Sequence, residues 1–156
     1  MEELKKETET VVEEPKFTEV VEDNFQMSET INELASALAK AQGMMKAVGK
    51  GKEGYNYNYS DLASVQDASR KPLSDNGIAV VQSVETLRRK APWIACTTMV
   101  LHESGQWIRS RLAMPVVQMK SVSPAQAIGA TITYARRYSW QAVLGMASED
   151  NDASIK

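Results

Sequence analysis

The sequence predicts one α+β domain, in which N-terminal helices precede a three-stranded antiparallel sheet and a long C-terminal helix. Apolar residues recur at three- and four-residue steps near both ends of the body, and three alternating or β-branched segments lie between them. The length of 156 residues fits one domain. We expect an acidic, disordered tail over residues 1–27, a core over 28–147 and a short acidic tail over 148–156.

Two helices are expected in the first half of the body. The first covers about residues 28–48 and begins at Ser28 or at the capping box formed by Thr30 to Glu33. The second begins near Ser60, a good N-cap residue. It is expected to end or kink just before Pro72, because proline disfavours the helical conformation of the preceding residue.

The second half predicts three strands and a long helix. The strands cover about residues 78–84, 93–101 and 107–114, and residues 102–105 connect the last two as a hairpin. The helix, over about 123–145, has a serine at its cap, a proline at its first position and a glutamine three residues after the cap. The core domain therefore follows a strand–strand–strand–helix order.

The charge of the chain is divided unevenly. The net charge of -2 conceals a body with seven acidic and fourteen basic residues over 30–147, whereas residues 1–29 carry ten acidic and three basic residues. This asymmetry indicates a polyanionic partner for the body, although a solvated surface with an acidic tail would give the same pattern.

The composition excludes several kinds of protein. A single cysteine, Cys96, and a single histidine, His102, exclude an intramolecular disulfide and a Cys/His zinc site within one chain. No apolar run is long enough to suggest a membrane span, and the acidic N-terminus does not resemble a secretory signal. We therefore expect a protein of the reducing cytoplasm with no membrane partner.

A glycine-rich basic segment follows the first helix. Gly49 to Gly54 match the spacing G-x-G-x-x-G, but a dinucleotide-binding loop needs a preceding strand and a following helix. A P-loop is also excluded, because Gly51 stands where serine or threonine would bind magnesium. The segment therefore predicts a mobile loop in which Lys50 and Lys52 can contact phosphates.

Three alternating tyrosines come next. On an extended segment the rings of Tyr55, Tyr57 and Tyr59 would face the same side. They could pack into the core, or they could form a platform on which nucleic-acid bases stack beside the lysines. Tyr55 lies nearest the basic loop and is expected to be the most accessible of the three.

Two pairs of arginines are further candidates for phosphate contacts. Arg109 and Arg111 alternate with apolar residues in the third strand, so both lie on one face. Arg136 and Arg137 follow Tyr134 in the last helix and point about 100° apart. One of this pair can therefore face a ligand while the other pairs with a carboxylate, and a solvated helix face is the alternative.

A catalytic site is hard to assemble from these residues. His102 lies in a hairpin connection, and Cys96 falls in an apolar strand, where cysteine is more often part of the core. Glu149, Asp150 and Asp152 form an acidic cluster beyond the last helix, whereas a two-metal nuclease holds its carboxylates on rigid elements. We therefore expect no enzymatic activity and no cofactor.

Several segments, in this order, carry a family resemblance over about residues 30–152. They are Tyr57–Ala63, Leu73–Gln82, His102–Ile108, Gln126–Ala130, Thr133–Tyr138, Leu144–Gly145 and Glu149–Asp152. The sequence resembles the ERF (essential recombination function) family of phage single-strand annealing proteins. Its acidic N-terminal extension departs from the family pattern, and a C-terminal partner-binding domain, if relatives have one, is missing.

The resemblance implies a protein of the bacterial host cytoplasm that binds single-stranded DNA and anneals complementary strands without a nucleotide cofactor. It also implies homo-oligomers, as rings or filaments, and a β-β-β-α core. A single-strand-binding protein or an exonuclease, of phage or host, is a further expected partner. The residues expected to bind nucleic acid are Lys50, Lys52, Tyr55, Tyr57, Arg109, Arg111, Tyr134, Arg136 and Arg137.

Three other functions remain open from the sequence. An RNA-binding or RNA-chaperone module would use the same basic and aromatic residues, since only contacts to the 2′-hydroxyl separate the two sugars. A metal-dependent nuclease would use the acidic cluster near the C-terminus. A scaffold that binds only proteins would show no salt-sensitive affinity for oligonucleotides.

Overall fold

The computed structural model describes residues 24–46, 61–87, 91–118 and 120–147, and the backbone of 52–54 and 57–59. The elements in chain order are β1 (Phe25–Met27), α1 (Asn32–Met44), β2 (Lys52–Gly54), β3 (Tyr57–Tyr59), α2 (Leu62–Asp75), β4 (Ile78–Leu87), β5 (Trp93–His102), β6 (Trp107–Pro115) and α3 (Pro124–Leu144). The predicted α+β class is confirmed.

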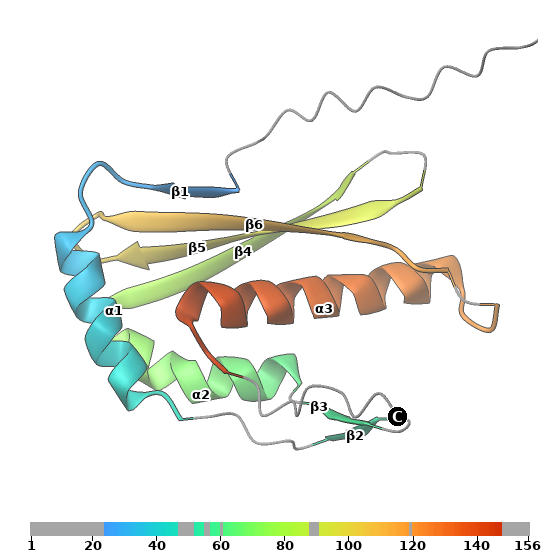
Figure 1. Cartoon of the computed structure of the whole chain (residues 1–156), viewed down its shortest axis with the longest axis horizontal. Helices are drawn as coiled ribbons and strands as arrows, with labels where there is room; N and C mark the ends of the chain where they lie inside the picture. Colours follow the sequence, from blue (N-terminus) through green and yellow to red (C-terminus); the bar gives the residue numbers. More distant parts are fainter. Residues whose placement is uncertain are drawn as a thin grey trace, which may run out of the picture.

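The main sheet has four antiparallel strands in the order β1-β6-β5-β4 (Figure 1). The three expected strands form its meander, but the prediction missed β1, which pairs Phe25 with Ser110 and Met27 with Ile108. The predicted acidic tail includes the residues of β1, and the structure corrects this boundary. Three residues are too few to show a strand pattern, so the pairing with β6 defines this strand.

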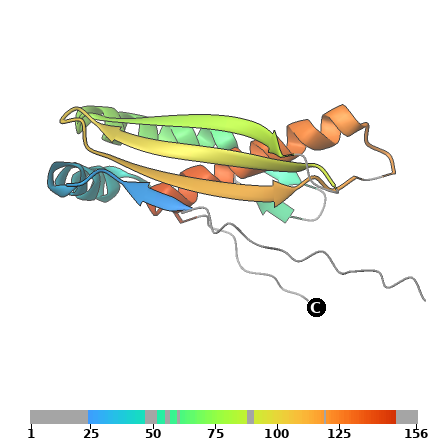
Figure 2. The ribbon, with the colours of Figure 1, turned by 90° about the horizontal axis from the view of Figure 1, so that it is seen from above.

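All three helices cover one face of this sheet (Figures 1 and 2). The alternating residues Ile94, Cys96, Thr98 and Val100 of β5 are buried on that face. α3 packs across β5 and β6, while α2 packs against α3 and β4. The core therefore lies between the sheet and the helices, and no described helix covers the opposite face.

α2 passes through a proline that was expected to end or kink it. The helix continues to Asp75, and both Pro72 and Leu73 are buried. Because Pro72 lies near the end of the helix, its missing N–H affects only the final turn. The side-chain amide of Asn76 donates to the Pro72 carbonyl at 2.8 Å, which satisfies one of the exposed carbonyls at the helix end.

The start of α1 differs from the sequence prediction. The N-cap residue is Ile31, and neither Ser28 nor Thr30 caps the helix. Instead, Oε1 of Gln106 accepts hydrogen bonds from the backbone N–H groups of Glu33 and Leu34, both at 2.9 Å. A side chain from the turn between β5 and β6 therefore caps a helix more than seventy residues earlier in the chain.

α3 begins and ends as predicted. The side chain of Ser123 and that of Gln126 form a reciprocal capping box, and Pro124 occupies the first turn. Gly145 ends the helix with a φ of 64°, in the left-handed region that favours glycine. These local signals position the arginines of α3 over the sheet.

Candidate nucleic-acid interface

Arg136 of α3 is held by a side chain from the edge strand β4. The Nε2 group of Gln82 donates to the backbone carbonyl of Arg136 at 2.9 Å and to Oγ1 of Thr98 at 3.0 Å. In return, Nε of Arg136 donates to Oε1 of Gln82 at 3.3 Å. The hydroxyl of Thr98 lies 2.6 Å from that of Ser139. The network therefore joins strands β4 and β5 to α3.

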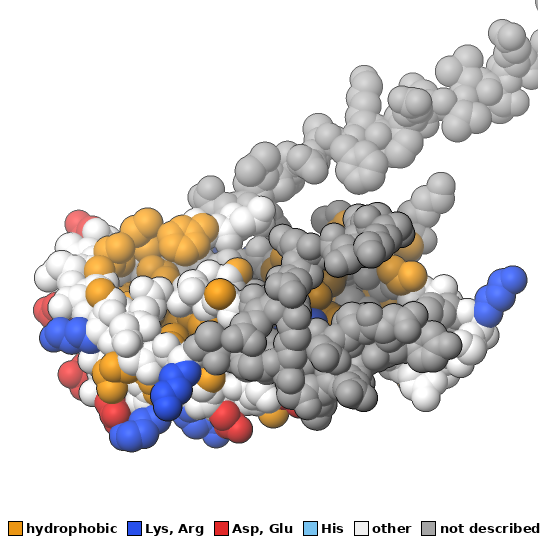
Figure 3. Space-filling view, turned by 60° about the horizontal axis from the view of Figure 1, so that its bottom comes forward, with side chains coloured by type: hydrophobic (Ala, Val, Ile, Leu, Met, Phe, Trp, Pro, Cys, Tyr) orange, Lys and Arg blue, Asp and Glu red, His pale blue; other side chains and the backbone are white. Residues whose placement is uncertain are grey.

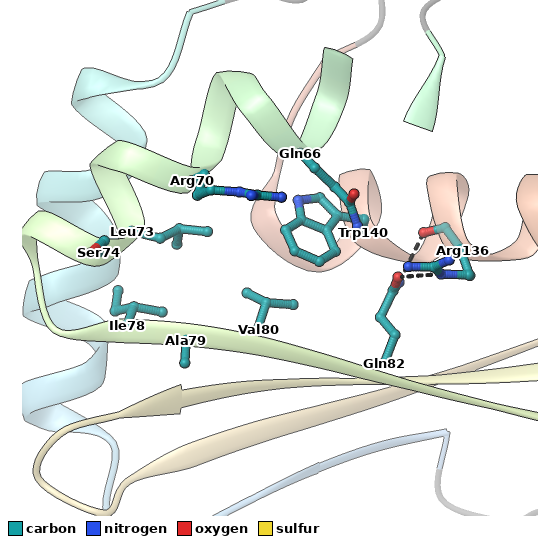
Figure 4. A pocket seen from close by; sticks show the side chains of 10 residues that line it. All are labelled: Gln66, Arg70, Leu73, Ser74, Ile78, Ala79, Val80, Gln82, Arg136 and Trp140. Carbon is teal, nitrogen blue, oxygen red and sulfur yellow. Dashed lines mark hydrogen bonds between the residues drawn. The ribbon is translucent and has the colours of Figure 1, made fainter. Parts of the chain in front are cut away.

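This network fixes Arg136 beside a pocket. The pocket has a volume of about 340 Å³ and lies between α2, β4 and α3 (Figure 4). Arg136 lines one end of it, with its side chain against that of Gln82. A half-buried guanidinium in a preformed pocket is a suitable contact for a phosphate group.

Arg137 has different surroundings from its neighbour. It is 6% exposed, and its guanidinium carbon lies 5.0 Å from the ring centroid of Tyr134 and 4.9 Å from that of Tyr138. The two rings stack on each other with centroids 5.9 Å apart. Arg137 thus holds two tyrosines together, and Tyr138 remains 43% exposed.

Arg109 and Arg111 lie on the opposite face of the main sheet. They pair in register with Met99 and Thr97 of β5, which alternate with the residues buried under the helices. Arg111 also reaches across β5 to Glu85, with its Nη2 atom 2.6 Å from the carboxylate. Within one subunit the structure does not bring these arginines together with Arg136, because the sheet separates them.

The glycine-rich segment leads into a small hairpin. β2 pairs with β3, which places Lys52 opposite Tyr59 and Gly54 opposite Tyr57 in the register. This hairpin lies on the helix side of the main sheet (Figure 1). Lys50 and Tyr55 lie outside the described residues.

The described surface on the helix side carries charges of both signs. Figure 3 shows lysine and arginine side chains next to aspartate and glutamate side chains, with apolar side chains exposed between them. The excess of basic residues in the body is therefore not gathered into one uniform patch on the described part of this side.

The single cysteine and the single histidine both make contacts within the fold. Cys96 is fully buried, and burial raises the pKa of its thiol above the ordinary 9.0, although hydrogen bonds from Thr98 and Ser139 and the charge of Arg136 oppose the rise. Nδ1 of His102 lies 2.8 Å from the hydroxyl of Ser104 in the hairpin turn.

The described residues contain no cluster of three His, Cys, Asp or Glu side chains that could hold a metal ion. The acidic group of Glu149, Asp150 and Asp152 lies outside the part of the chain that the structure describes. The described residues therefore give the nuclease alternative no support.

The burial of the Cys96 thiol can be tested by chemical modification and by unfolding at different pH values. We expect iodoacetamide to modify it far more slowly in the native protein than in denaturant at neutral pH, because the thiolate is the reactive form. A raised pKa stabilises the fold below the ordinary value of 9.0, and this contribution is lost as the pH rises above it. The free energy of unfolding should therefore fall more steeply above pH 9.0 than in Cys96→Ala. Equal labelling rates with and without denaturant would contradict the assignment.

Sequence reasoning missed Gln82 as a residue of this site. It occupies an inward position of β4, two residues after Val80 and four after Ile78, where the alternation predicts an apolar side chain. A lone amide at such a position indicates a specific buried partner, because an unpaired polar group in a core is costly. That partner is Arg136.

Comparison with known proteins agrees with the family resemblance. A model of the ERF superfamily matches residues 34–156, which include every described element after β1 except the first two residues of α1. No curated protein and no solved structure matches the chain. None of the described helices is long and apolar enough to cross a membrane. Since the match extends over most of the sequence, this chain belongs to the ERF superfamily.

Proposed function

We propose that this protein binds single-stranded DNA and anneals complementary strands during phage homologous recombination, without ATP. Membership of the ERF superfamily supports a role in phage recombination and annealing. The observation that carries the proposal is the position of Arg136 beside an accessible pocket. The side chain of Gln82 forms hydrogen bonds with both the backbone carbonyl and the guanidinium of Arg136, which fixes this position. A preorganised guanidinium loses little entropy when it binds phosphate.

In this proposal cationic side chains neutralise phosphates and leave the bases free. Arg136 forms the contact on the helix side. Lys50 and Lys52 are assigned further phosphate contacts, and Tyr55 and Tyr57 are assigned to support the strand. Tyr134 supports it from α3, where Arg137 holds the tyrosine in place. Lower phosphate charge reduces the repulsion between two strands, and base pairing supplies the free energy of annealing.

Arg109 and Arg111 belong to a second contact in this mechanism. They lie on the sheet face opposite Arg136, so one DNA segment would meet both sets only where subunits stand next to each other. We propose assembly into a ring or filament of identical subunits. Among the described strands, β1 and β4 lie at the edges of the main sheet, and the backbone groups along such edges can support this assembly.

The test of this function is the annealing of two dye-labelled complementary oligonucleotides without ATP. We expect the protein to raise the annealing rate, and its affinity for single strands to fall with salt at a log–log slope of about -0.7 per neutralised phosphate. A protein that neither accelerates annealing nor binds oligonucleotides in a salt-sensitive way would be a scaffold instead.

Two additional arms separate the remaining alternatives. RNA and DNA oligonucleotides of one sequence compete for the protein, and a clear preference for RNA would favour the RNA-chaperone alternative. Labelled single strands are also incubated with magnesium or manganese. Shortened products would favour a nuclease that uses the acidic cluster, whereas intact strands are expected from an annealing protein.

A further inference from the structure

We propose that the pocket between α2 and β4 is a seat for one sugar–phosphate unit of the bound strand, and that Arg70 is its second cationic residue. The inference rests on the proposed binding of single-stranded DNA. It adds a residue of α2 to the interface, outside the segments of basic sequence that first suggested nucleic-acid binding.

The pocket has the size and the walls that such a unit needs. Its volume of about 340 Å³ lies within the range of preformed ligand sites. Leu73 and Val80 provide apolar walls, and the indole of Trp140 lies between Arg70 and Arg136 (Figure 4). The indole is fixed because its Nε1 group donates to the hydroxyl of Ser69 at 3.0 Å. The pocket is therefore formed before any ligand arrives.

The pocket also has an unbalanced positive charge. Arg70 from α2 and Arg136 from α3 both line it, and no aspartate or glutamate is among its lining residues in the described chain. Arg70 is exposed and has no ion pair with any described residue. Its neighbour Lys71 is paired with Asp75 at 2.8 Å. Anionic groups that contact the two guanidinium groups would balance the charge of the pocket.

The combination of charge and apolar walls favours the backbone of the strand over its bases. Phosphates can contact Arg70 and Arg136 on the two sides of Trp140 (Figure 4), while the carbon atoms of the deoxyribose between them contact Leu73 and Trp140. A base buried in the pocket would hide its pairing edge, which annealing has to leave free. The sugar–phosphate unit is therefore the part of the strand that fits both the pocket and the proposed function.

The experiment compares Arg70→Gln with Lys71→Gln, two variants with the same charge change at adjacent exposed positions of α2. Removing one phosphate contact is expected to reduce the salt slope of binding by about 0.7, which corresponds to about fivefold weaker affinity at 0.1 M salt. Lys71→Gln should bind as the wild type does. Urea unfolding of both variants is measured alongside, and we expect no change because both side chains are exposed.

An abasic oligonucleotide identifies the part of the strand that is bound. A sugar–phosphate seat predicts that Arg70→Gln weakens binding of the abasic strand as much as that of the ordinary strand. A loss seen only with bases present would overturn the proposal in favour of a base pocket. Inorganic phosphate is the third probe, and competition by phosphate alone at the affinity of the oligonucleotide would show that the strand is not the ligand.

The remaining outcomes separate this inference from the proposed function. If the wild type binds single strands and Arg70→Gln keeps its affinity and salt slope, the seat is wrong while the function stands. If the wild type does not bind, the function itself fails. If Arg70→Gln changes the assembled mass in light scattering without DNA, the pocket joins two copies of the chain and the proposal is overturned.

Discussion

Replacement of Gln106 by alanine is expected to lower the free energy of unfolding by about 2–3 kcal/mol. Its Oε1 atom accepts two backbone N–H groups at the start of α1, and its Nε2 group donates to Thr30 Oγ1 at 3.2 Å and to Asn32 Oδ1 at 3.0 Å. Alanine would leave all these groups without this partner. Because Ile31 at the N-cap has no side-chain cap of its own, nothing in the described helix start replaces the lost acceptor.

Gln106→Glu is the matched control for this prediction. Glutamate keeps an acceptor at the same distance from the backbone, and its negative charge is favourable near a helix N-terminus. It loses only the donors to Thr30 and Asn32, so we expect it to retain most of the stability. Urea unfolding of the three proteins gives the comparison. Equal losses in the alanine and glutamate variants would show that Gln106 does not act as the cap.

The adjacent arginines of α3 should give opposite results when they are replaced one at a time. Arg137→Ala is expected to lower the free energy of unfolding by about 2–3 kcal/mol, because it removes two cation–π contacts in a largely desolvated place. Arg136→Gln should cost less stability, since glutamine keeps an amide that can donate to Gln82, but it should weaken single-strand binding about fivefold at 0.1 M salt. Replacing both should weaken binding to all sequences alike, since phosphate contacts carry no sequence information.

The same two measurements on each variant check this prediction. Urea unfolding reports stability, and a fluorescence titration across a salt series reports affinity and its slope. A well-folded Arg136→Gln protein that binds as tightly as the wild type at every salt concentration would remove Arg136 from the interface. An Arg137→Ala protein of unchanged stability would contradict the role assigned to the tyrosine contacts.

Local signals account for the parts of the fold that could be predicted. The capping residues of α3 and its terminal glycine each act on the helix turn next to them, and β5 and β6 pair around a short turn. The features that were missed depend on distant partners. β1 exists through its pairing with β6, and the cap of α1 comes from Gln106. Sequence spacing alone does not contain these pairings.

In the candidate site, too, local features could be predicted from the sequence and contacts between distant segments could not. The step of about 100° between helical neighbours gives Arg136 and Arg137 different surroundings, but the contacts described above for Arg137 are with tyrosine rings, whereas the sequence predicted a carboxylate partner for one of the pair. The relation between α3 and the Arg109–Arg111 pair was not predictable, because it depends on which face of the sheet the helices cover. Gln82 lies in a segment without basic residues, and Arg70 and its neighbour Lys71 lie in a helix that the sequence prediction did not connect with binding. Only the packing of α2 against β4 brings Arg70 and Gln82 to the pocket.

The cap that Gln106 provides also has a consequence for the order of folding. The amides of Glu33 and Leu34 gain their acceptor only after the β5–β6 turn has formed and come to rest beside α1. Contacts between segments so far apart in a chain form late, since loop closure has to precede them. The first turn of α1 should therefore become protected from hydrogen exchange after the hairpin, although it is made earlier by the ribosome.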